Sequence, residues 1–595
     1  MSTVHVEQGQ LAGEERNGVY SFLGIPYAAP PVGDRRWRPP AAPQAWEGVR
    51  DATEFGNAAI QTVNTGMVLG APESEDCLYL NVWTTNPAPN ARQPVMVWLH
   101  GGGFLNGSAS LPIWPGDQLC RNGVTVVSLN YRLGAFGFLT HPDAGANFGL
   151  QDWVAALEWV RKNIRAFGGD PDNVTVFGQS AGAAASRALL STPSARGLFH
   201  KAVIQSAGFE DYAVVGSPSN QRSADASAQL CQRLGSDDID VLRQAPAEEV
   251  RAASFALSGT NPPPGQVHTP ANLVWYPVVD GAVMVDDFAG WPDEVPVMLG
   301  CTEDEARFFV QPTMLYAHPE VKPEDAYTPE TLAGMAAALG GDRADDILAY
   351  FAASGAKPYE AIAELITAVV WHEPALASLR RFADLGRTSY AYRFARVSPG
   401  ARQSGLLAKH SAEIPYLFGS MVPAQAYEER DYEVSRQVQH AWTEFARTGT
   451  PRSVDGSPWP VYRNQDPKNR LDRGHNRNSP ADPEPADGTD RELPSDRRAR
   501  LSARRIRWKP FRQPMAERCP TKPTATVRSW CCWRGVRALT RCPSLPEWSC
   551  RGSANWCSAP AGPGCRIRPP RPKATGSRGM SATSRSSATI WGSNS

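Results

Sequence analysis

The sequence predicts the α/β class, with a largely parallel sheet wrapped by helices. Short, continuously apolar runs rich in β-branched residues, such as VMVWL (95–99) and VTVVSL (124–129), alternate with helix-like stretches between Pro94 and about Gly208. Continuous apolar runs of this kind are typical of strands covered on both faces. Their alternation with helices favours parallel strands joined by crossover helices.

The clearest helix is expected over residues 150–167. Its apolar side chains recur every three or four residues and form one stripe, made of Leu150, Trp153, Val154, Leu157, Val160 and Ile164. The stretch Gly168–Gly169–Asp170–Pro171 should end this helix, because glycine favours the C-terminal cap and proline cannot continue the helix.

Further elements follow the same alternation. The segment 215–295 is polar and contains prolines, which predicts helical excursions between sheet strands. The absence of an internal repeat argues against a solenoid or a propeller. Strands are expected at NVTVF (173–177), HKAVIQSA (200–207), VPVMLG (295–300) and SYAYRFA (389–395), and helices at 330–353 and 358–386.

The net charge of zero hides an asymmetry along the chain. Residues 491–595 contain 22 Lys+Arg and 4 Asp+Glu, a net of +18, which leaves 38 basic and 56 acidic residues in 1–490, a net of −18. Phosphate contacts need Lys and Arg, so the acidic body is not expected to bind nucleic acid.

The C-terminal part differs from the body in composition, and we predict a body over residues 1–470 and a tail over 471–595. The tail is rich in Arg, Ser and Pro, and seven of the eleven cysteines lie between Cys519 and Cys565. It lacks helical or strand periodicity, which predicts disorder. A shifted reading of a GC-rich gene or an unrelated extension would explain it. A zinc module is disfavoured because there is no C-x-x-C pair and no histidine in 476–595.

The sequence favours a cytoplasmic protein without a membrane segment. The N-terminus MSTVHVEQGQ lacks the basic and apolar regions of a signal peptide. No run of 18 or more apolar residues occurs. The body has four widely spaced cysteines, which favours free thiols in a reducing compartment: Cys77, Cys120, Cys231 and Cys301.

The strongest local signal for chemistry is Gly178–Gln179–Ser180–Ala181–Gly182, between a predicted strand and a small-residue helix. This is the G-x-S-x-G pattern of a nucleophile elbow, in which a tight strand-to-helix turn exposes a strained serine. Glycines allow the neighbouring backbones to approach. The alternative is a glycine-rich packing turn, but the strand–turn–helix context favours Ser180 as a nucleophile.

A second motif, His100–Gly101–Gly102–Gly103–Phe104, follows the strand at 95–99. Three glycines expose backbone N–H groups that, with the N–H of Ala181, could stabilise a tetrahedral oxyanion. A flexible turn or a phosphate loop is the alternative, although the Gly-Lys-Ser/Thr of a Walker loop is missing.

A nucleophilic serine needs a base, because its hydroxyl is hardly ionised at neutral pH. In α/β-hydrolases the acid and then the histidine follow the serine along the chain. His372, His410 and His440 are the late candidates, and spacing alone does not choose among them.

Long motifs resemble the type-B carboxylesterase/lipase family of α/β-hydrolases, which also contains the cholinesterases. The resemblance covers roughly residues 5–465. It rests on GVYSFLGIPYAAPPVGDRRWRPP (18–40), EDCLYLNVW (75–83), HGGGF (100–104), NYRLGAFGFL (130–139) and the long stretch 147–182 that ends in GQSAG.

The resemblance implies an α/β-hydrolase fold with helical insertions that form a substrate gorge. It places the family's serine at Ser180, its acid at Glu305 in GCTEDEARFF (300–309) and its histidine at His410 in HSAEIPYLFG (410–419). Its oxyanion donors fall on the amides of Gly102, Gly103 and Ala181. It pairs Arg36 with Glu75 and Arg132 with Asp170, and it leaves His372 and His440 to helices.

The implied activity is hydrolysis of small-molecule carboxylic esters through an acyl-enzyme, without a metal or organic cofactor. A carbamate or aryl amide could be cleaved by the same residues. A non-catalytic binding module is disfavoured because all three triad positions are filled. Because His410 must be neutral to act as a base, activity should fall below about pH 6–7. The oligomeric state is left open.

The sequence departs from the family pattern in three places. Gln179 stands where the residue before the serine is usually glutamate, which should weaken attraction for cationic substrates and alter the pH profile. The stretch between about residues 57 and 76 has no tryptophan, which argues against cholinesterase specificity. No cysteine precedes Cys77, so the N-terminal disulfide of secreted members cannot form.

Overall fold

The computed structural model describes residues 2–464 except 63–67, 208–219, 259–272, 286–294, 311–321 and 423–425. These residues belong to one compact unit, Met1–Gly488. The tail expected over 471–595 lies outside the described residues, so its predicted disorder and its boundary at 470 stay predictions.

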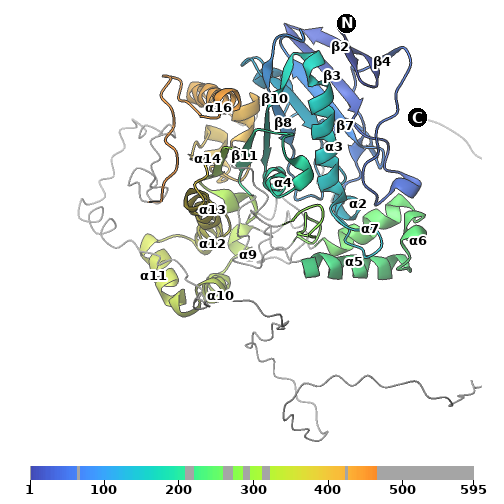
Figure 1. Ribbon diagram of the computed structural model, residues 1–595. Helices are drawn as coiled ribbons and strands as arrows, with labels where there is room; N and C mark the ends of the chain where they lie inside the picture. Colours follow the sequence, from blue (N-terminus) through green and yellow to red (C-terminus); the bar gives the residue numbers. More distant parts are fainter. Residues whose placement is uncertain are drawn as a thin grey trace, which may run out of the picture. The chain divides into compact units, whose positions relative to one another are not determined.

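Within the described residues, one 11-stranded sheet runs through the body, in the order β1-β2-β3-β7-β9-β8-β10-β11-β12-β13, with β4 paired to β2 (Figure 1). Along the order from β1 to β9 the neighbouring strands pair antiparallel, whereas β4 pairs parallel with β2. All pairs from β9 to β13 in this order are parallel, which confirms the expected largely parallel sheet. The strands are β1 (Ser2–Val6), β2 (Gly9–Arg16), β3 (Val19–Pro26), β4 (Val49–Asp51), β7 (Tyr79–Thr84), β8 (Gln93–Leu99), β9 (Thr125–Leu129), β10 (Gly169–Gln179), β11 (Lys201–Gln205), β12 (Val297–Thr302) and β13 (Ser389–Phe394). β5 (Ala58–Ala59) and β6 (Glu73–Ser74) form a separate pair.

The central strands are buried on both faces, which is why they are apolar throughout. Along β8, Val95 and Val97 belong to one hydrophobic core, whereas Met96 and Trp98 belong to the other. The helices α3 (Phe148–Asn163) and α4 (Ala181–Leu190) supply the first core. The second core receives residues from α1 (Gly116–Cys120), α15 (Ile414–Phe418) and α16 (Glu429–Thr448).

The helix expected at 150–167 is confirmed with small shifts at both ends. α3 starts at Phe148 and continues into the 3₁₀ turn η2 (Ile164–Phe167). Gly168 caps it with φ 80°, a left-handed conformation that glycine adopts without a steric penalty.

The helical excursions form two groups, labelled α5–α7 and α10–α13 in Figure 1. The first follows β11 and consists of α5 (Asn220–Leu234), α6 (Ile239–Arg243) and α7 (Ala247–Leu257). The second consists of α10 (Pro329–Gly340), α11 (Ala344–Ser354), α12 (Pro358–Thr367), the π-helical turn η7 (Ala368–His372) and α13 (Glu373–Asp384). The remaining short helices are η1 (Gly33–Arg35), α2 (Gly134–Phe138), η3 (Pro193–Ala195), η5 (Glu305–Phe308), α9 (Pro323–Ala326), η6 (Gly341–Arg343) and α14 (Pro399–Gln403).

The continuous helix Pro358–Asp384 is the one described helix that is long and apolar enough to cross a membrane by length and composition. Of its apolar window, 56% is buried inside the fold. A core helix of a soluble protein passes the same test, so this feature is weak evidence for a membrane segment.

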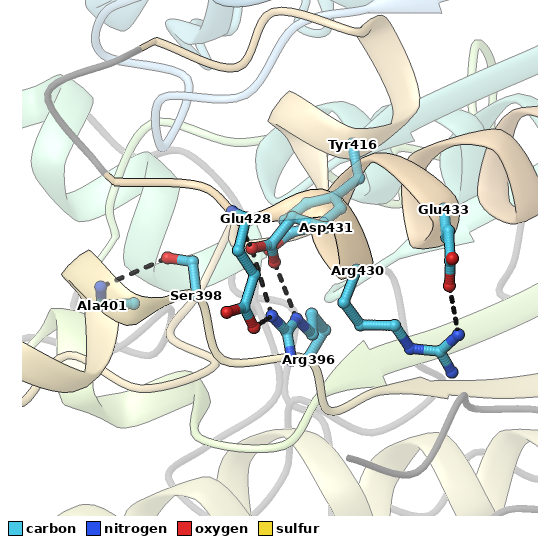
Figure 2. Close-up of polar contacts among 8 residues, drawn as sticks. All are labelled: Arg396, Ser398, Ala401, Tyr416, Glu428, Arg430, Asp431 and Glu433. Carbon is cyan, nitrogen blue, oxygen red and sulfur yellow. Dashed lines mark hydrogen bonds and ion pairs between the residues drawn. The ribbon is translucent and has the colours of Figure 1, made fainter. Parts of the chain in front are cut away.

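An ion-pair cluster around the buried side chains of Arg396 and Asp431 fixes α16 to the segment that follows β13 (Figure 2). Arg396 Nε donates to Asp431 Oδ1 at 2.7 Å, and its Nη2 also pairs with Glu428. Tyr416 of α15 donates its hydroxyl to Asp431 Oδ1 at 2.6 Å. Because charged groups remain stable in an interior only when they are paired and hydrogen-bonded, this cluster gives α15 and α16 one relative position.

Of the two predicted structural ion pairs, one is confirmed and one is wrong. Arg36 and Glu75 pair at 2.6 Å. Arg132 instead forms a bidentate pair with Asp152 of α3, at 2.8 and 2.6 Å. Asp170 pairs with the exposed Arg92 at 3.0 Å. Arg132 contacts the first turns of α3, whereas Asp170 follows its far end, so the helix length, about 24 Å for 16 residues, separates them.

Replacing Asp152 with asparagine should lower the free energy of unfolding by about 3–5 kcal/mol, because the Arg132 guanidinium would stay buried without a carboxylate. The matched control is Arg92→Ala, which removes an ion pair whose arginine side chain is 52% exposed and should cost about 0–1 kcal/mol. Urea unfolding followed by tryptophan fluorescence measures both. Equal losses in the two variants would contradict the expected role of burial.

Candidate active site

The nucleophile elbow forms where β10 ends and α4 begins. Ser180 lies between them with φ 57° and ψ −125°, the strained conformation expected for an exposed nucleophile. Ser180 is partly exposed, whereas its neighbours Gln179 and Ala181 are buried.

The elbow requires its glycines because three stretches of backbone touch there. A Cβ at Gly182 would lie 1.8 Å from the carbonyl oxygen of Leu99, the last residue of β8. A Cβ at Gly178 would lie 2.3 Å from the carbonyl carbon of Gly182. Any side chain at these positions would push the helix away from the sheet.

The triple-glycine loop after β8 lies next to the elbow. A Cβ at Gly101 would lie 3.2 Å from Ser180 Cβ and 2.7 Å from the Gln179 carbonyl oxygen. Gly102 and Gly103 have φ 117° and 63°, and the Gly102 carbonyl accepts from the amides of Leu105 and Asn106. These contacts hold the loop in one shape.

The amides predicted as oxyanion donors are available in this part of the structure. Among the described residues, the N–H groups of Gly102, Gly103 and Ala181 donate no hydrogen bond. Ala181 is the first residue of α4, where N–H groups have no partner within the helix. A tetrahedral oxyanion is stabilised by backbone N–H groups of this kind, so the prediction that these three amides form the oxyanion hole stays a prediction.

His100 is buried beneath this loop and packs against Tyr131. Its ring stacks on Tyr131 with centroids 4.5 Å apart, and the Tyr131 hydroxyl donates to the His100 carbonyl at 2.9 Å. Burial lowers the pKa of His100 to about 4, so it is neutral at physiological pH.

The structure brings Glu305 and His410 together. Glu305 begins η5, separated by two residues from the end of β12. His410 lies between α14 and α15, in the segment that follows β13, the parallel neighbour of β12. His410 Nδ1 lies 2.5 Å from Glu305 Oε2, and the Thr302 amide donates to Glu305 Oε1 at 2.8 Å. Both residues are buried, at 4% and 0% exposed. The short contact between the Glu305 carboxyl group and Nδ1 fixes the orientation of the imidazole ring.

An aromatic shell surrounds this pair. The rings of Phe309, Trp371 and Phe308 have centroids 5.1, 5.7 and 6.0 Å from that of His410. The Trp371 indole donates to the Ser206 carbonyl at 3.0 Å, which fixes its orientation. The shell shields the Glu305–His410 pair from water and strengthens its electrostatic interaction.

Ser180 and His410 lie in one site without a direct hydrogen bond between them in the described part of the chain. The second ring nitrogen, His410 Nε2, lies 3.0 Å from the side-chain nitrogen of Gln179. Among the described residues, no group of three or more His, Cys, Asp and Glu side chains could hold a metal ion.

Residues 1–485 match the family model described as the Carboxylesterase family. The chain belongs to this family. The match extends beyond residue 470, so the boundary predicted there is left as a prediction.

This carboxylesterase is 35% identical over 483 residues to the fumonisin B1 esterase of Sphingopyxis macrogoltabida, covering 77% of this chain and 84% of the relative. It is 34% identical over 484 residues to the para-nitrobenzyl esterase of Bacillus subtilis (strain 168), covering 77% and 92%. A solved structure titled PNB esterase matches with a TM-score of 0.64 at 32% identity, covering 78% of this chain and 93% of that one. The chain is a carboxylic-ester hydrolase with the fold that these esterases share.

Several side-chain contacts in the site of the carboxylesterase were not predicted from the sequence. Phe308 and Phe309 stood in the motif around Glu305, but nothing in the sequence marked them as neighbours of His410. Trp371 and Gln179 reach the histidine from distant segments. His372 and His440 lie in η7 and α16, as the resemblance implied. The four cysteines of the body are free, as expected, and all four are buried.

Replacing Gly182 with alanine should lower the esterase kcat/KM by about 10²-fold or more, because a displacement of the nucleophile by about 1 Å has that effect. Gly334→Ala is the control, since a methyl group added at Gly334 in α10 would meet no atom within 4 Å and should leave kcat/KM unchanged. Hydrolysis of p-nitrophenyl butyrate by both purified variants measures the effect. An unchanged rate for Gly182→Ala would disprove the close approach at the elbow.

Proposed function

We propose that this carboxylesterase cleaves esters by two-step acyl transfer, with Ser180 as nucleophile, His410 as base and Glu305 as orienting acid. The observation that carries the proposal is the 2.5 Å contact between His410 and Glu305 beside the strained Ser180. Serine, carboxylate and histidine in this chain order are the pattern of α/β-hydrolases.

In the first step Ser180 Oγ attacks the ester carbonyl carbon while its proton moves to His410 Nε2. Glu305 stabilises the imidazolium that forms, and it keeps the ring oriented through Nδ1. The carbonyl oxygen becomes an oxyanion, for which the amides of Gly102, Gly103 and Ala181 are the proposed donors. The alcohol then leaves with the proton from His410.

In the second step water attacks the acyl-enzyme. His410 takes one proton from the water, and the tetrahedral intermediate collapses to release the carboxylic acid, which loses its remaining proton to the solvent. Ser180 recovers its proton from His410, which returns the enzyme to its starting state. Residues of this chain supply every group that the two steps need.

The proposed substrates are carboxylic esters of small or medium size without a positive charge. Gln179 is uncharged where the family usually has a carboxylate, so nothing at this position attracts a cation. The relatives named as fumonisin B1 esterase, para-nitrobenzyl esterase and phenmedipham hydrolase differ in their named substrates. Free buried thiols support a cytoplasmic, reducing location, which is part of this proposal.

Replacing Ser180 with alanine should reduce turnover by about 10⁶-fold, because losing the serine of a comparable triad has that effect. Hydrolysis of p-nitrophenyl acetate, butyrate and octanoate measures it, and a p-nitrophenyl carbamate tests the alternative bond. The control is Ser186→Ala in the same helix, whose hydroxyl donates to the Gly182 carbonyl. Equal activity of Ser180→Ala and the unmodified protein would refute the proposal.

Replacing Glu305 with glutamine should reduce kcat by about 10⁴-fold, because an amide in place of the acid favours the wrong histidine tautomer. Glu303→Gln is the matched control, since Glu303 pairs with Arg393 at 3.4 Å and does not contact His410. Steady-state kinetics with p-nitrophenyl butyrate distinguishes the two. A similar small loss of kcat in both variants would contradict the proposed role of Glu305 as the orienting acid.

A further inference from the structure

The side chain of Gln179 contacts the ring nitrogen of His410 that would accept the proton of Ser180. The carboxamide nitrogen of Gln179 lies 3.0 Å from His410 Nε2, and both residues are almost fully buried, at 3% and 4% exposed. When Nδ1 carries the ring proton and faces Glu305, Nε2 carries a lone pair. The Gln179 N–H then donates to Nε2.

A ring nitrogen has one lone pair in the plane of the ring and accepts one strong hydrogen bond at a time. The Gln179 amide and the Ser180 hydroxyl therefore compete for the same acceptor. In the structure the Gln179 side chain contacts this acceptor, His410 Nε2, and Ser180 Oγ has no hydrogen-bond partner among the described residues. Ser180 cannot pass its proton to His410 until this contact breaks.

The backbone of Gln179 is fixed in the sheet, so only its side chain is free to change conformation. Gln179 is the last residue of β10 and is paired with Gln205 of β11. Its carboxamide oxygen lies 3.3 Å from the position that a Cβ of Gly101 would take. The side chain thus extends between the triple-glycine loop and His410, where the ester carbonyl must enter to reach the oxyanion donors.

We propose that Gln179 is a positioning residue that donates to His410 Nε2 in the free enzyme and is displaced when an ester enters, so that it restrains the attack of Ser180. This inference rests on the proposed function of Ser180 and His410. A carboxamide suits the role because it donates a hydrogen bond and keeps the same charge at every pH. A glutamate at this position would instead place a negative charge at Nε2.

Other ionisable groups surround His410 and must be considered in any pH test. The Lys409 ammonium donates to the His410 carbonyl at 3.2 Å, and burial lowers its pKa to about 8. Burial, followed by the charge of Glu305, raises the pKa of Glu413 to about 7. Burial also raises the pKa of Asp304 to about 6.

Two further groups lie behind the acid. Burial lowers the pKa of His372 to about 4, and His372 Nε2 lies 2.9 Å from the Thr302 carbonyl oxygen. Burial, followed by the charge of Glu305, raises the pKa of the Cys301 thiol. All these groups are identical in the unmodified protein and in a variant at position 179. A difference between the two pH profiles therefore reports on residue 179.

The test uses diethyl p-nitrophenyl phosphate with Gln179→Met and Gln179→Glu. In this reaction the Ser180 Oγ–P bond forms, p-nitrophenolate leaves, and the serine proton moves to His410 Nε2. The second-order rate of p-nitrophenolate release is measured from pH 5 to 9. Gln151→Met is the control, because Gln151 lies in α3 and its amide donates to the carbonyl of Ala146, which precedes this helix.

Gln179→Met removes the competing donor. Its second-order rate of p-nitrophenolate release should be roughly 2- to 10-fold higher, which corresponds to the loss of one neutral hydrogen bond. In Gln179→Glu a carboxylate beside Nε2 stabilises the imidazolium, so the ring stays protonated to higher pH. The acidic limb of its rate profile should move upward by about 1 to 3 pH units. Gln151→Met should match the unmodified protein in both respects.

The proposal is overturned if Gln179→Met reacts no faster, or if the acidic limb of Gln179→Glu does not move. Should the methionine variant fail to fold, Gln179→Leu carries the same expectation. Peptide mass analysis of the phosphorylated protein separates the two levels of inference. If Ser180 of the unmodified protein is not labelled, the proposed function fails and this inference fails with it. If Ser180 is labelled but the variants behave like the control, only the role of Gln179 is lost.

Discussion

The close approach of three backbone segments at the end of β10 is the constraint on which the site depends. A side chain at Gly178 or Gly182 would not fit between β8, β10 and α4, because it would collide with neighbouring backbone, including the Leu99 carbonyl. This contact forces the chain to turn within one residue, and Ser180 takes the strained conformation as a result. The same contact brings the loop after β8 against the serine, so the nucleophile and the proposed oxyanion donors are fixed by one packing arrangement.

The order of strands supplies the rest of the site. Carboxyl ends of parallel strands meet at the same edge of a sheet, which is where open α/β folds build their sites. Glu305 follows β12 and His410 follows the neighbouring β13, so two residues far apart in sequence meet at that edge. The buried Arg396–Asp431 cluster fixes the helices that come after His410 (Figure 2). His410, the proposed base, thus lies between two fixed segments of the chain.

The errors of the sequence interpretation have a physical origin. Parallel strands and the long helix α3 were predictable because local patterns of apolar residues determine them. The pairing of Arg132 with Asp170 was wrong because charged residues carry no local signal for their partners. Only the folded chain decides that Asp152, within the first turns of α3, lies closest to Arg132. The pairing of Arg36 with Glu75 was correct, and the two side chains lie 2.6 Å apart.

The sequence by itself determined the fold class, the elbow serine, the glycine loop and, through family motifs, the candidates Glu305 and His410. These features depend on short stretches of sequence, which can be recognised without the folded structure. The tertiary structure alone decided which side chains meet at the histidine: the aromatic rings of Phe308, Phe309 and Trp371, and the Gln179 amide at Nε2. Such contacts depend on distances of 3 to 6 Å between segments far apart in sequence, which only the packing of the whole sheet and its helices fixes.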